Sequence, residues 1–257
     1  MSLLQTIIYG VISGLCHMSP ISWSGHLSLV QYFWGDFQEP SAFLTLVYTA
    51  LLLAIIIFFR KDLWRLLRHP LQRYTYITLC AALVGTAAGI VFKDNLASTM
   101  PWPWLTVVLM AVTTVLLWMT GKYHGKKRII DMSAIEALLI GLFGALSLFP
   151  GLSFPAIVIF LAMQRGVNKQ SAFKFSYIIM IPILLGLILR SWYDALFFTG
   201  TFVITPQEGI AAVIAGFAGF LAIYMTQNLL EKRKYYRFSL YCLIVVIISA
   251  GALLLGM

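Results

Sequence analysis

Long apolar runs separated by short basic loops constrain the fold of this chain more than any other feature. A helix needs about 20 mainly apolar residues to cross a bilayer, and runs of about that length recur along the chain. Hydrophobic residues make up 61% of the 257 residues and charged residues only 11%, whereas soluble domains average about 25% charged residues. The sequence therefore predicts an all-α integral membrane protein. Its six predicted transmembrane helices are 41–59, 75–92, 104–121, 171–189, 209–229 and 238–256.

Two further apolar stretches, 10–26 and 141–156, are interrupted by glycine, proline and serine. Glycine and proline both weaken a continuous helix. Irregular backbone is tolerated inside a bilayer only where it is buried in protein or lines a cavity. We therefore predict two opposed re-entrant helical hairpins, 5–34 and 135–164, which enter the membrane from opposite sides and build one site between them.

The basic residues give the predicted helices an orientation. If loop 60–73 is cytoplasmic, 15 of the 18 lysines and arginines fall on the cytoplasmic side, as the positive-inside rule expects. Lys93, Lys174 and Arg190 are the exceptions. Both termini then lie on the outer face. Because membrane topology accounts for most of the net charge of +9, we expect no nucleic-acid partner.

Matching residues recur at a constant offset of 130 along the chain. The longest match is Ser-Ala-Phe, at 41–43 and again at 171–173. Each half contains one hairpin and three spans, and an odd number of crossings inverts the second half relative to the first. Such inverted repeats are common in transporters, whose sites lie near the bilayer midplane at the repeat interface. We predict one membrane domain built from two inverted repeats, 1–128 and 129–257.

Three motifs resemble those of the undecaprenyl pyrophosphate phosphatases, the bacitracin-resistance proteins. The motifs are Pro20-Ile21-Ser22 with Ser24-Gly25-His26-Leu27, then Pro150-Gly151-Leu152-Ser153, then AFKFSYIIMIP at 172–182. The resemblance covers essentially the whole chain. It implies a multi-pass protein of the bacterial inner membrane, with six spans and two opposed hairpins. It also implies a ligand, a polyprenyl phosphate or pyrophosphate of the kind that carries cell-wall precursors.

The chain departs from the family pattern at several polar positions. The family's first motif has two glutamates, where this chain has Ser13 and His17. Its second motif has an arginine where Phe154 stands, Trp23 replaces a serine, and Lys174 occupies a usual arginine position. Carboxylates would serve as the base or hold a divalent metal, and an arginine would bind phosphate bidentately. These departures argue against the family reaction.

Polar side chains retained in the hairpins are candidates for holding a phosphate, since hydroxyl, imidazole and ammonium groups can all contact it. The candidate ligand-binding residues are His26, Ser22, Ser24, Ser153, Lys174, His17 and Ser13. Trp23 and Phe154 are expected either to line an isoprenyl groove or to plug the space left by lost polar groups. Structural roles are the alternatives: His26 bonding hairpin backbone, Ser13 packing between helices, and Lys174 extending to the cytoplasmic surface. No metal site and no cofactor are expected.

Three functions are open on the sequence. The leading hypothesis is a protein that lacks the family's catalysis, binds a polyprenyl phosphate and moves it across the membrane. The second is an undecaprenyl-diphosphate phosphatase with a rebuilt site, in which His17 or His26 acts as the base for Ser22. Ser24 is the alternative nucleophile. The third is a transporter or receptor for another amphipathic anion. A homodimer is compatible with each of them.

Overall fold

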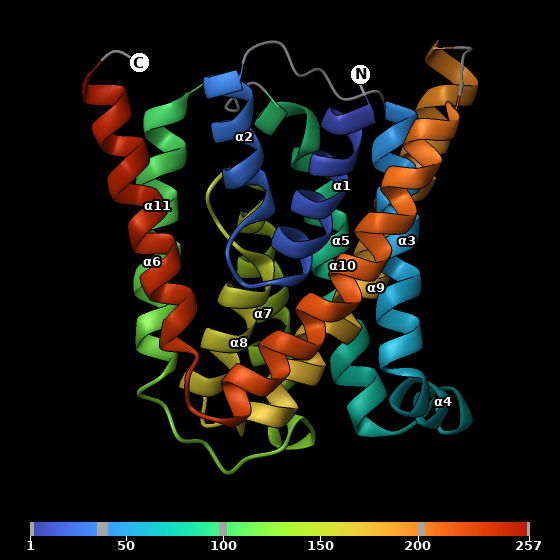
Figure 1. The fold of residues 1–257 in the computed structure, drawn as a ribbon. Coiled ribbons are helices and arrows are strands. Elements are labelled where there is room, and N and C mark those ends of the chain that lie inside the picture. Colours follow the sequence, from blue (N-terminus) through green and yellow to red (C-terminus); the bar gives the residue numbers. More distant parts are fainter. Residues whose placement is uncertain (1–2, 35–40, 98–101, 200–203, 256–257) are drawn as a thin grey trace.

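The computed structural model describes residues 3–34, 41–97, 102–199 and 204–255, and it is built from helices (Figure 1). These residues form no β-strand beyond an isolated bridge between Lys127 and Val167. The long helices are α1 Leu3–Met18, α2 Trp23–Trp34, α3 Ser41–Phe58, α4 Arg60–Arg68, α5 Arg73–Ala97, α6 Pro103–Thr120, α7 Ala134–Ala145, α8 Phe154–Gln164, α9 Lys169–Asp194, α10 Pro206–Glu231 and α11 Tyr236–Leu254. Three short helical turns are η1 Ile129–Asp131, η2 Leu146–Leu148 and η3 Ala195–Thr199.

Four of the described helices, α6, α9, α10 and α11, are long and apolar enough to span a membrane. A fifth span results if α3 and α4 are counted as one helix bent by 78°. The predicted helical membrane fold is therefore confirmed at the level of four or five candidate spans. The full count of six spans stays a prediction, as do the re-entrant character of the hairpins and the inverted repeat.

Two helical hairpins meet in the middle of the bundle. Figure 1 shows α1 and α2 running inward from the end that carries both termini, and α7 and α8 running inward from the opposite end. The two turns touch: a Cβ atom built on Gly25 would lie 2.9 Å from the Cα atom of Gly151. The tips of both hairpins therefore share one space at the centre of the molecule.

Each hairpin packs its first helix directly onto a helix of the other half. A Cβ on Gly10 of α1 would lie 2.5 Å from the carbonyl oxygen of Ala211 in α10, and one on Gly141 of α7 would overlap the carbonyl of Ala81 in α5. Small residues at such crossings let helix backbones approach closely. Ala81 and Ala211 are 130 residues apart, the offset of the two predicted repeats, and the inverted repeat stays a prediction.

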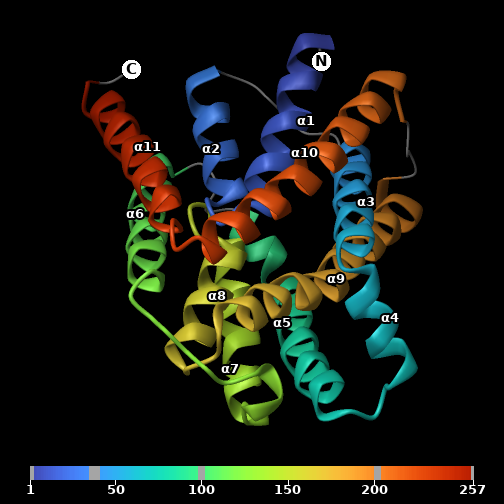
Figure 2. The ribbon, with the colours of Figure 1, turned by 60° about the horizontal axis from the view of Figure 1, so that its bottom comes forward.

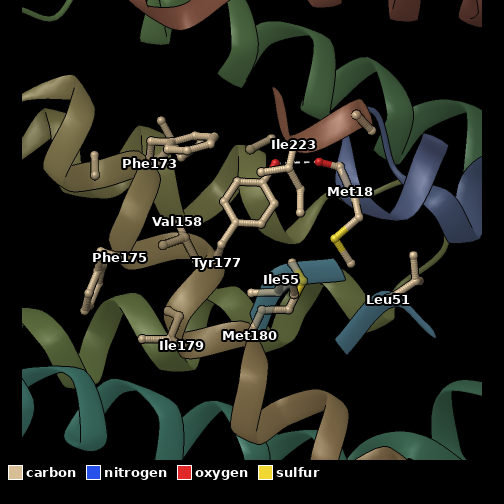
Figure 3. Packing of buried hydrophobic residues seen from close by; sticks show 14 of the residues in the cluster. Met18, Leu51, Ile55, Val158, Phe173, Phe175, Tyr177, Ile179, Met180 and Ile223 are labelled. Carbon is tan, nitrogen blue, oxygen red and sulfur yellow. Dashed lines mark hydrogen bonds between the residues drawn. The ribbon is translucent and has the colours of Figure 1, made fainter. Parts of the chain in front are cut away.

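The first hairpin is tied to α9 through the buried core (Figure 3). The Tyr177 hydroxyl of α9 donates a hydrogen bond to the carbonyl oxygen of Met18, the last residue of α1. Both residues are fully buried, and Phe59 stacks on the Tyr177 ring with centroids 5.8 Å apart. This bond satisfies a carbonyl that the end of α1 leaves without a helical partner.

Replacing Tyr177 by phenylalanine should lower the free energy of unfolding by about 1–3 kcal/mol, because the buried Met18 carbonyl would lose its donor. Thermal unfolding of the detergent-solubilised protein measures the change. Tyr235→Phe is the matched control, since the Tyr235 hydroxyl is equally buried but makes no hydrogen bond to the described residues. Equal effects of the two variants would contradict the role given to the Met18 bond.

Segment 60–73, predicted as a loop, instead contains the helix α4. Its leucines and tryptophan recur at helical spacing among basic residues, a pattern too short to be read as a span. Helix α9 also continues to Asp194, beyond the predicted end at residue 189. Figure 2 shows α4 at the edge of the bundle, directly after the end of α3. We call the end of the bundle formed by α4, loop 121–133 and turn 231–236 the basic end.

Candidate functional site

A cavity of about 380 Å³ lies where the hairpin tips meet α3 and α9. Both hairpins contribute to it, so residues more than 100 positions apart face one space. The lining residues are Cys16, His17, Trp23, Ser24, Leu27, Gln31, Leu44, Tyr48, Ser147, Leu148, Leu152, Ser153, Phe154, Pro155, Met180, Ile183, Leu184 and Leu187. We call this space the central cavity.

Two helices begin at the central cavity. Helix α2 starts at Trp23 and α8 starts at Phe154, and residues at the start of each helix line the cavity. Ser153 is the N-cap of α8 and its hydroxyl accepts a hydrogen bond from the Ala156 N–H at 3.5 Å. The N-terminus of a helix carries partial positive charge and unpaired N–H groups, which favour an anion. Two such helix N-termini at one cavity can stabilise a phosphate group through their dipoles and N–H groups, although neither carries a formal positive charge.

Ser22 precedes α2 and holds its first turn. Its backbone lies in the left-handed region, with φ of 68°. A residue other than glycine keeps this conformation only where the surrounding structure stabilises it. Its hydroxyl accepts a hydrogen bond from the Gly25 N–H at 3.1 Å and lies 3.5 Å from the Ser24 hydroxyl. Ser22 is buried and does not line the central cavity, whereas Ser24 does.

His17 lies on the central cavity wall, beside two aromatic rings. Its ring centroid is 5.1 Å from that of Trp23 and 5.7 Å from that of Tyr48. Its Nδ1 atom is buried and makes no hydrogen bond to the described residues. The indole N–H of Trp23 donates to the Ser13 hydroxyl at 3.3 Å. Ser13 thus orients Trp23 from behind the wall, and the His17 ring lines the cavity while its Nδ1 atom is turned into the protein.

The His26 ring lies outside the central cavity, between α2 and α11. Its Nδ1 lies 2.8 Å from the carbonyl oxygen of Ser22, and its Nε2 lies 3.0 Å from the Tyr241 hydroxyl. Since a carbonyl only accepts, Nδ1 carries the proton and Nε2 accepts from Tyr241. The two rings also stack, with centroids 5.5 Å apart and planes 6° apart. His26 therefore bonds hairpin backbone, as the structural alternative expected.

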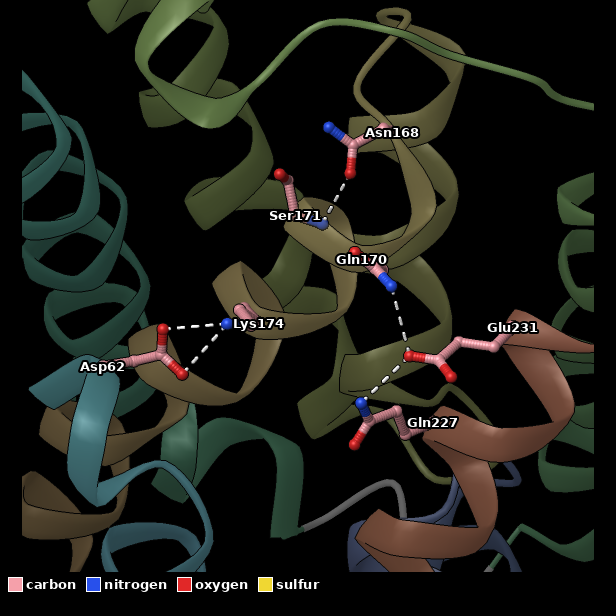
Figure 4. A network of polar contacts seen from close by, with 7 residues as sticks. All are labelled: Asp62, Asn168, Gln170, Ser171, Lys174, Gln227 and Glu231. Carbon is pink, nitrogen blue, oxygen red and sulfur yellow. Dashed lines mark hydrogen bonds and ion pairs between the residues drawn. The ribbon is translucent and has the colours of Figure 1, made fainter.

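Lys174 is also outside the central cavity. Its ammonium group contacts both carboxylate oxygens of Asp62, at 2.8 and 3.1 Å (Figure 4). The pair joins the start of α9 to α4 at the basic end. Of the nine residues predicted from the hairpin motifs and α9, five line the central cavity: His17, Trp23, Ser24, Ser153 and Phe154.

Among the residues that the structure describes, no aspartate, glutamate, lysine or arginine lines the central cavity. Across the described ranges, no three histidine, cysteine, aspartate or glutamate side chains come close enough to share a metal ion. Magnesium and calcium prefer several oxygen ligands, usually including carboxylates. The lining does not fit such an ion, and we derive no step through one.

Tyr48, Gln31 and Ser147 are polar lining residues that the motifs did not single out. Tyr48 lies within the predicted span 41–59, and a polar aromatic residue at that depth was the available signal. Ser147 belongs to the interrupted stretch 141–156, and the polar break in that apolar run was its signal.

Comparison with known proteins identifies the family. The family model "Bacitracin resistance protein BacA" matches residues 6–248. This chain belongs to that family. Among its relatives is undecaprenyl-diphosphatase 1 of Shouchella clausii, which is 30% identical over 96% of this chain and 95% of its own length. The undecaprenyl-diphosphatase of Thermosipho africanus is 30% identical over 95% of this chain and 97% of its own length.

Family membership confirms the resemblance that the hairpin motifs suggested. The relatives are named for hydrolysis of undecaprenyl diphosphate, which favours the second of the three sequence hypotheses over the leading one. The match begins in the first turn of α1 and reaches into the last helix, so all residues that line the central cavity of this BacA-family chain lie within the matched region.

Proposed function

We propose that this BacA-family protein is a lipid phosphatase that converts a polyprenyl diphosphate, of the undecaprenyl type, into the monophosphate and inorganic phosphate. The observation that carries the proposal is the central cavity, where helix N-termini of both hairpins and the imidazole ring of His17 line one space. The names of relatives that align with nearly the whole chain supply the substrate class.

In this proposal, the diphosphate lies at the N-termini of α2 and α8. Ser24 and Ser153 supply hydroxyl donors to its oxygens, and backbone N–H groups of the two first turns add to them. The isoprenyl chain contacts the apolar part of the lining, including Phe154 and Met180. The negative charge is thus balanced by fixed dipoles rather than by an arginine, which makes orientation of the headgroup essential.

His17 acts as the general base in this site. It accepts a proton from a water molecule while the water oxygen attacks the terminal phosphorus. The bond from that phosphorus to the bridging oxygen breaks, and polyprenyl phosphate leaves with the electron pair. Base catalysis by a positioned histidine typically contributes about 100- to 10,000-fold. The neighbouring Trp23 and Tyr48 rings hold the imidazole in place.

A second candidate function is carriage of the lipid without hydrolysis. The absence of any carboxylate or cationic side chain from the described lining favours it, because hydrolysis gains most from groups that stabilise developing charge. In that case the two opposed hairpins would act as alternating gates, and the protein would move a polyprenyl phosphate across the membrane. A related alternative is that the protein carries another amphipathic anion rather than a polyprenyl phosphate.

The proposed setting is a multi-pass position in the bacterial inner membrane, with the basic end on the cytoplasmic side and both termini outside. This orientation follows from the positive-inside rule. A homodimer is compatible with it.

Phosphate release from undecaprenyl diphosphate by the purified, detergent-solubilised protein tests the proposed function. Release above a protein-free control, with and without added divalent metal, is the expected result. No release together with retained binding of the lipid would overturn hydrolysis and support carriage. Movement of a labelled polyprenyl phosphate between the leaflets of proteoliposomes then decides carriage, and competition by short-chain anions separates a lipid site from a general anion site.

A further inference from the structure

A second cavity lies at the basic end, away from the hairpin tips. Its volume is about 360 Å³, and it lies between α4, the start of α5, the η1 segment and the start of α9. We call it the α4 hollow. The charged residues that line it are Asp62, Arg65, Arg128 and Lys174.

The charges of the α4 hollow do not balance. Asp62 is its only carboxylate among the described lining residues, and both of its oxygens are engaged by Lys174. The guanidinium groups of Arg65 and Arg128 make no hydrogen bond or ion pair to the described residues. Two arginines therefore face the hollow with their donors available, and a guanidinium fork matches the oxygens of a phosphate group.

Helix α4 has the character of a helix that lies in a membrane surface. It is bent by 78° from the apolar helix α3, so it runs nearly across the direction of a span. It buries none of its residues, and Trp64 and Leu67 are 57% and 74% exposed. The Arg68 guanidinium lies 4.9 Å from the centre of the Trp64 ring. A short helix with exposed apolar residues beside arginines typically lies among lipid headgroups.

We propose that the α4 hollow binds the phosphate headgroup of an anionic phospholipid from the leaflet at the basic end. Charge complementarity selects this occupant, because the hollow carries two unpaired arginines and borders a helix suited to the headgroup region. Arg65 and Arg128 hold the phosphate oxygens, while Trp64 and Leu67 contact the acyl chains. This site is separate from the central cavity and does not depend on whether the protein hydrolyses a diphosphate.

Lipid selectivity of the purified full-length protein in phosphatidylcholine vesicles tests this site. Electron paramagnetic resonance of spin-labelled phosphatidylglycerol, compared with spin-labelled phosphatidylcholine, measures the preference for the anionic lipid at the protein surface. We expect Arg65→Gln with Arg128→Gln to lower that preference at least about tenfold. An unchanged preference in the double variant would overturn the site.

Two further variants separate the hollow from general charge and from damage to the fold. Lys232→Gln with Lys234→Gln removes the same two charges from exposed positions at the basic end that lie outside the hollow, and it should change the preference less than about twofold. Asp62→Asn frees Lys174 and should raise the preference about fivefold, which a damaged fold would not do. Equal losses of the preference in both double variants would mean that it depends on surface charge alone, and would overturn the site.

Soluble glycerol 3-phosphate identifies the source of the phosphate. We expect a tenfold molar excess over the labelled lipid to leave the preference for phosphatidylglycerol within about twofold, since the acyl chains beside α4 hold the headgroup near the hollow. Complete displacement at that excess would assign the hollow to a free phosphate compound and would overturn the lipid proposal.

Discussion

Replacing His17 by phenylalanine should lower the rate of phosphate release from undecaprenyl diphosphate at least about 100-fold. Phenylalanine keeps an aromatic ring against Trp23 and Tyr48, so the wall of the central cavity should persist, while the nitrogen that accepts the proton is lost. The loss should appear mainly in kcat, because the headgroup contacts from the N-termini of α2 and α8 are unchanged.

His124→Phe is the matched control for this prediction. The His124 ring lies in the loop at the basic end, with its Nδ1 3.0 Å from the Lys122 carbonyl oxygen, and it is not among the residues that line the central cavity. The rate of phosphate release by the His124→Phe variant should stay within about twofold of the rate of the unchanged protein. His17→Glu adds a second check, since a carboxylate can also accept a proton and should recover a large part of the lost rate. If His17→Phe released phosphate at the original rate, His17 would not be the base.

The helical class and the position of the hairpin breaks could be predicted because they depend on local sequence. Apolar length and charge density define a membrane helix, and proline with glycine mark where a helix stops. The same breaks place Ser24 and Ser153 at the starts of two helices, which is why both belong to the central cavity. The position of His17 at the cavity could be predicted in the same way, since it lies in the last turn of α1, just before the first break.

The direction of side chains outside the breaks could not be predicted, because it depends on distant partners. His26 belongs to the same motif as Ser24, yet it turns to Tyr241, 215 residues away. Lys174 pairs with Asp62, 112 residues away, on a helix that was predicted as a loop. Neither partner is visible in a local pattern. Tyr48 reaches the cavity only because α3 packs beside the first hairpin.

Replacing Gly151 by alanine should lower the free energy of unfolding by roughly 2–5 kcal/mol. The φ angle of Gly151 is +102°, a conformation that side chains with a Cβ rarely adopt. The added Cβ would also lie 2.5 Å from the Thr106 carbonyl oxygen and 2.8 Å from the Met110 nitrogen, both on α6. Because these are backbone atoms of a span, they cannot move aside as a flexible side chain would.

The same substitution should impair the site as well as the fold. The Gly151 carbonyl accepts a hydrogen bond from the Thr113 hydroxyl at 2.7 Å, which fixes the tip of the second hairpin to α6 next to Ser153. Thermal unfolding in detergent measures the stability loss, and lipid binding measures the displaced tip. Gly209→Ala is the matched control, because a Cβ there meets nothing within 4 Å, and it should leave stability unchanged or raise it by up to about 1 kcal/mol. A Gly151→Ala protein as stable as that control would mean that the hairpin tip can move away from α6, and the shared geometry of the two helix N-termini would then not be fixed.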